Sequence, residues 1–105
     1  MLRAELYFGG NIGGALGVSK AQWAAFLRRE LAPRFPNGLT VVEAQGRWRD
    51  PAAGTMMREP SRLVIVVAAA DPDLRERLAA VAAVYKQRFK QTSVGVVTSS
   101  VCAAF

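Results

Sequence analysis

The sequence contains no histidine and a single cysteine, Cys102, among its 105 residues. These two absences exclude a Cys/His zinc site, a disulfide framework, haem ligation by histidine, and catalysis that pairs a serine or cysteine nucleophile with histidine. No cationic residue lies near Cys102 in the sequence, so we expect it to be a small buried hydrophobe rather than a thiolate. The sequence predicts neither a metal nor a cofactor.

Long hydrophobic runs are also missing. The longest unbroken apolar stretch extends from Leu63 to Ala70, whereas a helix that spans a bilayer needs about 20 apolar residues. We therefore expect no transmembrane segment. The first residues show a strand pattern without an apolar leader or a cleavage site, which as written predicts a cytoplasmic protein.

Acidic residues are few compared with basic ones. Eight Asp and Glu oppose fourteen Lys and Arg, which gives a net charge of +6. Such an excess favours anionic partners such as a phosphate, a nucleic acid, an anionic lipid or a carboxylate ligand, and it also keeps a small domain soluble. The length corresponds to one domain, residues 1–105.

The order of the elements predicts the fold. Hydrophobic alternation, helical spacing, capping residues and turn residues divide the chain into strand 2–8, helix 19–36, strand 39–49, turn 50–54, strand 62–70, helix 71–89 and strand 93–105. The order β-α-β-β-α-β predicts a ferredoxin-like α+β sandwich, with four antiparallel strands and two helices on one face. The first and third strands should be central, and Gly46 should mark a bulge or bend.

The third predicted strand is apolar on both faces. Helices cover only one face of such a sheet, so the side chains of the other face need a different cover. We expect a second subunit or a ligand there, and we predict a homodimer through the exposed sheet face or the edge strands. The two sets are Leu63, Ile65 and Val67 on one face and Val64, Val66 and Ala68 on the other, and we take the second set to be the open one.

Residues 9–17 contain five glycines between a strand and a helix. Backbone N–H groups in such a position can hold a phosphate. The glycine spacing does not match a dinucleotide-binding or P-loop motif, however, and we interpret the segment as a flexible connection.

Residues 6–12 are similar to the first-strand motif of RNA-recognition domains, which share the predicted topology. Those domains stack bases on aromatic residues of the third strand as well. The third strand here contains no aromatic residue. This argues against single-stranded nucleic acid as the partner.

A hairpin between the second and third strands would bring Arg47 and Trp48 close to Arg58 and Glu59. Guanidinium groups beside an indole wall suit an anionic small-molecule ligand with a carboxylate or phosphate group. The alternative is a cross-strand pairing of Glu59 with Arg47 or Arg49, with Trp48 packed in a core or a dimer seam.

Glu5 and Tyr7 share the sheet face that the helices leave open, and Glu43 joins them if the register of the neighbouring strand allows it. Two carboxylates and a phenol on a partly apolar face suit general acid–base catalysis, because burial would raise the pKa of a glutamate. The alternative is an ion pair of Glu5 with Arg3 or Arg62.

Several blocks of sequence resemble an uncharacterised bacterial family of small domains of unknown function, many of which look like secreted lipoproteins. The two specific blocks are Pro33–Val41 and Tyr85–Val94, and weaker similarity extends over nearly the whole chain. The resemblance implies an α+β fold and a location in the cell envelope or periplasm. It transfers no catalytic residue, and this chain lacks the leader and the lipid-attachment cysteine of the lipoprotein-like members.

Three classes of function remain open on the sequence alone. The first is a non-enzymatic binding or interaction module that acts as a homodimer, which we favour because the sequence shows no nucleophile–base pair and no cofactor motif. The second is a cofactor-independent small-molecule enzyme or ligand binder of the dimeric α+β barrel type. The third, nucleic-acid binding, is the weakest because the third strand lacks aromatic residues.

Overall fold

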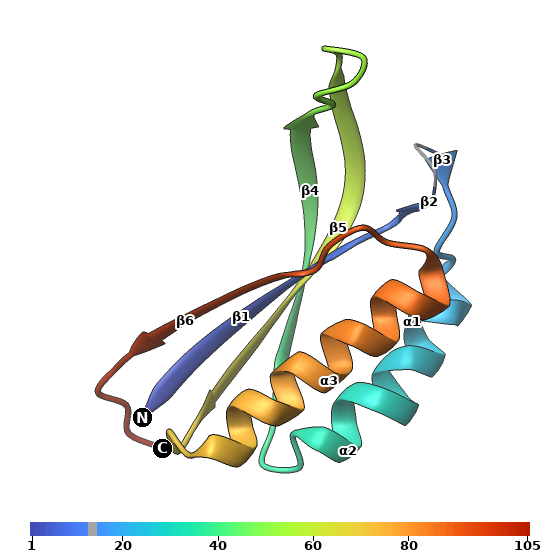
Figure 1. Cartoon of the computed structure of the whole chain (residues 1–105). Helices are drawn as coiled ribbons and strands as arrows, with labels where there is room; N and C mark the ends of the chain where they lie inside the picture. Colours follow the sequence, from blue (N-terminus) through green and yellow to red (C-terminus); the bar gives the residue numbers. More distant parts are fainter. Residues whose placement is uncertain (13–14) are drawn as a thin grey trace.

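Four strands form one antiparallel sheet in the order β4-β5-β1-β6 (Figure 1). They are β1 (Leu2–Gly9), β4 (Thr40–Arg49), β5 (Met56–Ala68) and β6 (Gly95–Ser100). The structure is a computed structural model that describes the backbone of residues 1–12 and 15–105 and the side chains of residues 1–11 and 17–105. The α+β fold with its central first and third long strands, β1 and β5, confirms the ferredoxin-like prediction.

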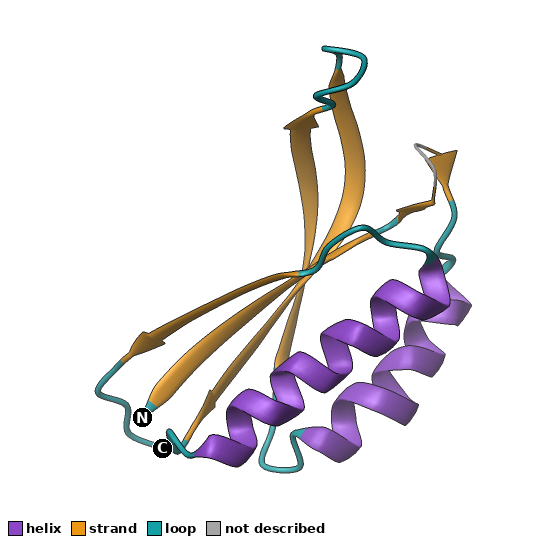
Figure 2. Cartoon of the chain, in the orientation of Figure 1, coloured by secondary structure: helices purple, strands orange, loops and turns teal. Residues whose placement is uncertain are grey.

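The helices lie together on one side of the sheet, as Figure 2 shows. The first is made of α1 (Lys20–Phe26), a π-helical turn η1 (Leu27–Leu31) and α2 (Ala32–Arg34), and the second is α3 (Pro72–Phe89). The predicted capping box is present, because the Ser19 hydroxyl accepts from the backbone N–H of Gln22. The π turn directly precedes Pro33, which has no N–H for a helical hydrogen bond.

Alternate residues of β1 point into a core between the sheet and the helices. Leu2, Ala4, Leu6 and Phe8 are buried there. Around Phe8 the rings of Trp23, Phe26, Tyr85 and Phe89 form an aromatic cluster, with centroid distances of 4.7 to 6.3 Å between neighbours. This cluster holds the end of β1 against both helices and so fixes its position in the molecule.

The segment that connects β1 to α1 forms a small two-stranded sheet of β2 (Asn11–Ile12) and β3 (Ala15–Leu16). The carbonyl oxygen of Gly10 accepts hydrogen bonds from the backbone N–H groups of Gly17 and Val18. The rest of the predicted flexible connection, Gly13 and Gly14, lies outside the described residues.

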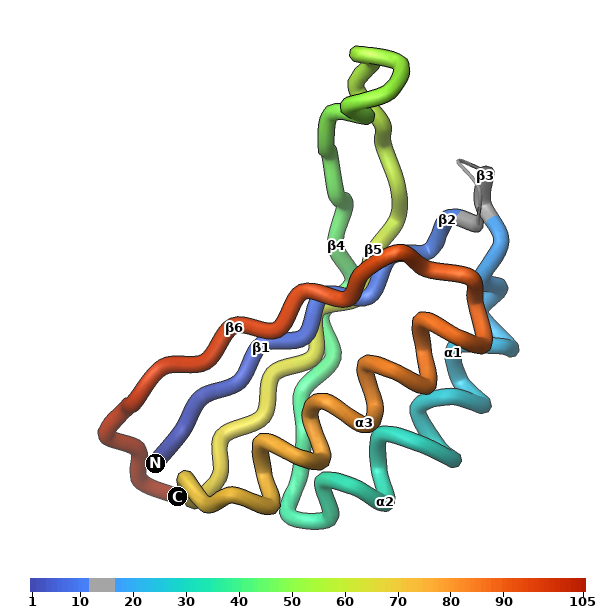
Figure 3. The backbone as a smooth tube through the Cα atoms, viewed as in Figure 1, coloured from blue at the N-terminus to red at the C-terminus, as the bar shows by residue number. Residues whose placement is uncertain are grey.

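The hairpin of β4 and β5 is longer than the sequence predicts. β5 begins at Met56 rather than at Arg62, and its pairing with β4 continues without a bulge from Thr40–Ile65 to Arg49–Met56. Since β1 ends at Gly9 opposite Ser61, the outer part of this hairpin has no further strand beside it. It extends away from the helices as a two-stranded arm (Figures 1 and 3).

The two faces of β5 are occupied differently from the prediction. Val64 and Val66 are buried under the helices, while Leu63, Ile65 and Val67 lie half-buried on the open face. The assignment of Val64 and Val66 to the open face was wrong, because these residues pair with the buried β1 residues Leu6 and Ala4. The open face is still largely apolar, with exposed Tyr7, Val42 and Val97 around β5.

Candidate functional site

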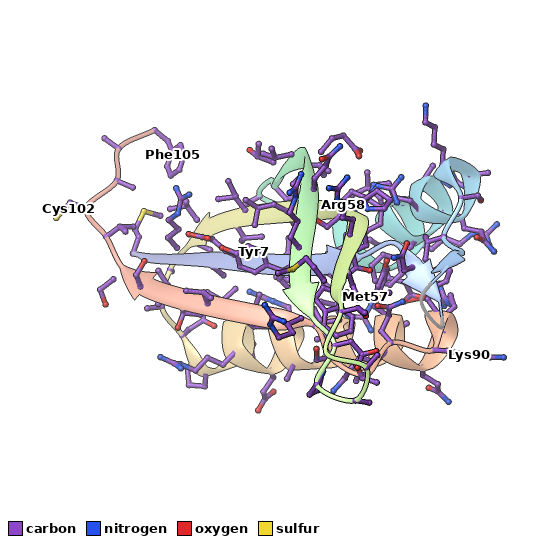
Figure 4. The ribbon with its side chains drawn as sticks, turned by 90° about the horizontal axis from the view of Figure 1, so that it is seen from above. Tyr7, Met57, Arg58, Lys90, Cys102 and Phe105 are labelled. Atoms are coloured by element: carbon purple, nitrogen blue, oxygen red, sulfur yellow. The ribbon has the colours of Figure 1, made fainter. Side chains whose placement is uncertain are left out.

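A cleft of about 560 Å³ opens where the hairpin arm leaves the sheet. One wall is the arm, the floor is the end of β1, and the other wall is the connection between α3 and β6. Figure 4 shows this region from above, with Tyr7 on β1 and Lys90 at the end of α3. The lining residues are Tyr7, Gly9, Asn11, Gly46, Trp48, Glu59, Ser61, Lys90, Gln91, Thr92, Ser93 and Gly95.

Glu59 is held in the cleft by the backbone at the start of β2, just after β1. Its Oε2 accepts a hydrogen bond of 3.1 Å from the backbone N–H of Asn11. A side chain at Gly9 would place its Cβ only 2.8 Å from Oε1, so the carboxylate can occupy this place only because residue 9 is glycine. Among the described residues, Oε1 receives no hydrogen bond from a donor of the chain, and it is free to accept one from a ligand.

The floor of the cleft is fixed from below by α3. The Tyr85 hydroxyl donates to the carbonyl oxygen of Gly9, and the Gln91 side-chain amide donates to the carbonyl oxygens of Asn11 and Phe89. Burial raises the pKa of Tyr85 to about 12, so this hydroxyl keeps its proton at every physiological pH. These bonds fix the backbone of residues 9–11, and the N–H of Asn11 in this segment in turn fixes the carboxylate of Glu59.

Trp48 forms the aromatic wall of the cleft. It lies on the arm opposite Met57, and 47% of its surface is exposed. A large indole with this exposure offers a flat face on which a ring can stack. Lys90 and the polar residues Thr92 and Ser93 line the opposite side.

The four residues predicted to bind an anionic ligand do not form one site. Arg47 and Arg58 are register partners on one face of the arm, whereas Trp48 and Glu59 lie on the other face. The arginines border a separate hollow of about 230 Å³ together with Gln45, Gly46, Glu59 and Pro60. The alternative pairing of Glu59 with Arg47 or Arg49 is also not formed within the described residues, since Glu59 accepts from Asn11 and Arg49 donates to the carbonyl of Gly54.

Glu5 and Tyr7 lie side by side on the open face, as predicted. The Tyr7 hydroxyl donates to Glu5 Oε2 at 2.5 Å, and Arg3 Nε donates to Glu5 Oε1 at 3.2 Å. Glu43 does not join them, because it pairs with Arg62 on the helix side of the sheet, 3.4 Å from Oε2 to Nε. Arg62 is itself buried, with its guanidinium carbon 5.2 Å from the centroid of the Trp23 ring.

The electrostatics of Glu5 differ from the prediction. The hydrogen bond from Tyr7, and after it the one from Arg3, lower the pKa of Glu5 below its ordinary value. The same bond raises the pKa of Tyr7. The expectation of a raised glutamate pKa was wrong here, because both oxygens accept hydrogen bonds that favour the ionised form. Glu5 is therefore ionised near neutral pH and is a weaker base than a free glutamate, which does not favour the predicted general-base role.

Several cleft residues were missed in the sequence. Asn11, Lys90, Gln91, Thr92 and Ser93 belong to short connections, and their spacing shows no motif. Only the predicted topology could have placed these residues together, since a ferredoxin-like fold brings the end of its first strand close to the connection before its last strand.

Two further findings concern metal sites and membrane-spanning helices. Within the described residues, no group of three or more Cys, Asp or Glu side chains is arranged to hold a metal ion. No helix in the described ranges is both long and apolar enough to cross a membrane. Cys102 is exposed, so the prediction of a buried thiol was wrong.

The architecture places the chain among α+β domains of the ferredoxin-like type, with a cleft where the hairpin arm leaves the sheet. The chain belongs to the DUF3574 family of proteins of unknown function, whose model matches residues 3–105. This confirms the resemblance to an uncharacterised family over nearly the whole chain. No curated protein matches the sequence significantly.

Solved structures show the same fold. A phage SAM lyase in complex with S-methyl-5′-thioadenosine superposes with a TM-score of 0.77 at 18% identity, over 93% of this chain and 79% of that one. The apo state of a phage SAM lyase gives a TM-score of 0.72 at 19% identity, over 93% and 78%. At these identities the likeness is one of fold.

Proposed function

We propose that this protein binds a small molecule of the nucleoside type in the cleft between the hairpin arm and β1. The observation that supports the proposal is the placement of Glu59, whose Oε1 is free to accept while Oε2 is fixed by Asn11. A fixed carboxylate opposite an exposed indole suits a ligand with a flat ring and a hydroxyl or amino donor.

The ligand class follows from the charges of the lining. Glu59 and Lys90 are the charged residues of the cleft, and the arginines of the arm face the other way. A neutral or cationic ligand therefore suits the cleft better than the anionic ligand expected from the sequence. The phage SAM lyase of similar fold is described in complex with S-methyl-5′-thioadenosine, a nucleoside with a thioether, which supports the same class.

This proposal favours the ligand binder, one of the alternatives open at the sequence level, over a module that only contacts other proteins. The predicted homodimer remains part of the proposal. It is supported by the apolar open face, where Tyr7, Val42 and Val97 are each at least 40% exposed. Light scattering of the purified protein tests it, with twice the chain mass as the expected result.

The binding proposal is tested by titrating the protein with S-methyl-5′-thioadenosine and following both heat and tryptophan fluorescence. We expect saturable binding and a change in the emission of the exposed Trp48. Glu59→Gln should weaken binding by about 10- to 100-fold, since a hydrogen bond to a charged acceptor contributes about 1.5–3 kcal/mol.

The matched control is Arg58→Gln, next to Glu59 in sequence but on the other face of the arm. It should bind as the unchanged protein does. Absence of binding at millimolar ligand, or an equal loss in both variants, would contradict the proposal.

A further inference from the structure

We propose that β6 is the edge through which two copies of this chain pair, antiparallel, into one continuous sheet. The inference rests on the homodimer proposed above and places its contact at this edge of the sheet instead of on the open face. β6 is the last strand of the order β4-β5-β1-β6, so one side of its backbone has no strand partner within the described part of the chain. The N–H and C=O groups on such an edge are a template for another strand.

The composition of β6 lacks the features that normally protect an edge. The chain has no charged residue and no proline after Lys90. All six residues of β6 are exposed, and the two valines Val96 and Val97 have 40% and 51% of their surface exposed. Charged side chains, prolines and bulges are the usual means by which a monomeric protein prevents edge pairing.

The opposite edge of the same sheet shows the contrast. β4 has Glu43, Arg47 and Arg49 along its length, and Arg47 lies beside Arg58. A strand approaching β4 would have to accommodate these charges. The sheet therefore has one protected edge and one unprotected edge.

The occupant that we propose is a second copy, because β6 is a neutral part of a positively charged molecule and can pair with its own copy. With a net charge of +6, two copies repel each other at most orientations. Exposed basic residues such as Arg28, Arg29 and Arg75 lie on the helices, whereas β6 is neutral. Pairing about a two-fold axis brings neutral strands together and needs no complementary partner.

The pairing would also extend the cleft. Ser93 and Gly95 line its wall at the start of β6, so an antiparallel second copy would place the end of its own β6 next to this wall. The dimer contact and the ligand site would then be neighbours, although they can be tested separately.

The test uses lysine substitutions on both faces of β6, with light scattering after size-exclusion chromatography as the measurement. Val97→Lys lies on the open face, since Val97 pairs with Glu5. Thr98→Lys lies on the helix side, since Thr98 pairs with the buried Ala4. In both variants we expect the mass to fall from two chains to one, because equal charges meet across the two-fold axis.

The matched control is Val42→Lys, which also lies on the open face but on the protected edge β4, with 40% exposure. It should remain dimeric. Dissociation by Val42→Lys and Val97→Lys with Thr98→Lys still dimeric would assign the contact to the open sheet face and overturn the proposal. An unchanged protein that is monomeric, or a dimer that none of the three variants dissociates, would overturn it as well.

These outcomes are independent of ligand binding. A protein that binds S-methyl-5′-thioadenosine but is monomeric retains the proposed ligand site and loses the edge contact. A protein that dimerises through β6 but binds no nucleoside loses the ligand site and retains the edge contact. Thermal unfolding of each lysine variant confirms that it is folded before its mass is interpreted.

Discussion

The two tyrosines of the chain have contrasting environments. Tyr85 is fully buried in the aromatic cluster, and its hydroxyl donates to the carbonyl oxygen of Gly9. Tyr7 is 44% exposed, and its hydroxyl donates to the Glu5 carboxylate. Without the Tyr85 hydroxyl, the carbonyl of Gly9 would be left without a hydrogen-bond partner in the core, which costs free energy. Without the Tyr7 hydroxyl, the exposed carboxylate of Glu5 can accept a hydrogen bond from water instead.

We therefore expect Tyr85→Phe to lower the free energy of unfolding by about 1–3 kcal/mol. Tyr7→Phe, the matched control, should leave urea unfolding unchanged. Equal effects of the two variants would show that the Tyr85–Gly9 bond does not stabilise the end of β1.

The titration of Tyr85 gives a second prediction. In a Tyr7→Phe protein, Tyr85 is the only tyrosine, and its phenolate absorbance should appear with a midpoint of about 12 instead of the ordinary 10.0. The raised pKa favours the protonated form in the folded state, so this stabilisation is complete below pH 10 and is lost as the pH rises towards 12. A midpoint near 10 in the folded protein would contradict the burial of this phenol.

The predicted ligand-binding residues are divided between two hollows for a geometric reason. Arg47 and Trp48 are neighbours in one strand, and successive side chains of a strand point to opposite faces. The alternation therefore separates the arginines from Trp48. Glu59 borders both hollows, one with Arg47 and Arg58 and the other with Trp48. The face on which Glu43 lies is set by the register of β4 against β5, in which Glu43 pairs with Arg62. The sequence does not specify this register.

At the scale of elements, the junction between β1 and the hairpin arm depends on a close backbone contact. The N–H of Gly10 donates to the carbonyl oxygen of Pro60 at 2.8 Å, and a Cβ on Gly10 would lie 2.7 Å from that oxygen. Real Cβ atoms do not approach a backbone oxygen so closely. The end of β1 and the base of the arm must separate if this residue gains a side chain.

Gly10→Ala should therefore destabilise the protein and weaken ligand binding, because the floor and the arm of the cleft move apart. Gly46→Ala is the control within the arm, where the nearest atom would be at 3.6 Å. It should be neutral or slightly stabilising, since alanine loses less backbone entropy on folding than glycine. Calorimetric melting of both variants checks the effect on stability, and ligand titration of the Gly10→Ala protein checks the effect on binding.

The length of β5 shows why element boundaries were harder to predict than element types. Pro60 lies in the middle of residues 56–64 and normally argues against a strand, because it cannot donate to a neighbour. Its carbonyl instead accepts from Gly10, while only β4 pairs with this part of β5. The apolar core of the strand was predicted correctly because its hydrophobic residues continue without interruption.

At the scale of the molecule, one aromatic cluster joins the sheet to both helices. Phe8 is completely buried, with ring centroids 4.7 Å from Tyr85, 5.5 Å from Trp23 and 5.6 Å from Phe26. The fold could be predicted from the sequence because such apolar residues recur at period two in the strands and at helical spacing in the helices. The cleft could not, because its polar residues lie on connections whose positions depend on the whole fold.

Phe8→Ala should lower the free energy of unfolding by about 3–5 kcal/mol, because it removes a buried ring and leaves a cavity among three others. Domains of this size have about 5–15 kcal/mol in total, so the variant should unfold at a much lower urea concentration. Met56→Ala, which truncates a side chain of the arm that is 54% exposed, is the control and should change the midpoint little. Similar midpoints for the two variants would contradict the central place of this cluster.

The tip of the arm, residues 51–55, is exposed and closes through contacts within the turn, where Asp50 accepts from Ala52 and Gly54. Nothing in the aromatic cluster depends on this turn, and longer surface turns cost little free energy. Insertions there would lengthen the arm beyond Trp48 and Glu59, which line the cleft, while the packed layers stay as they are. Relatives with this architecture could thus acquire different molecular preferences through changes in a few turn residues.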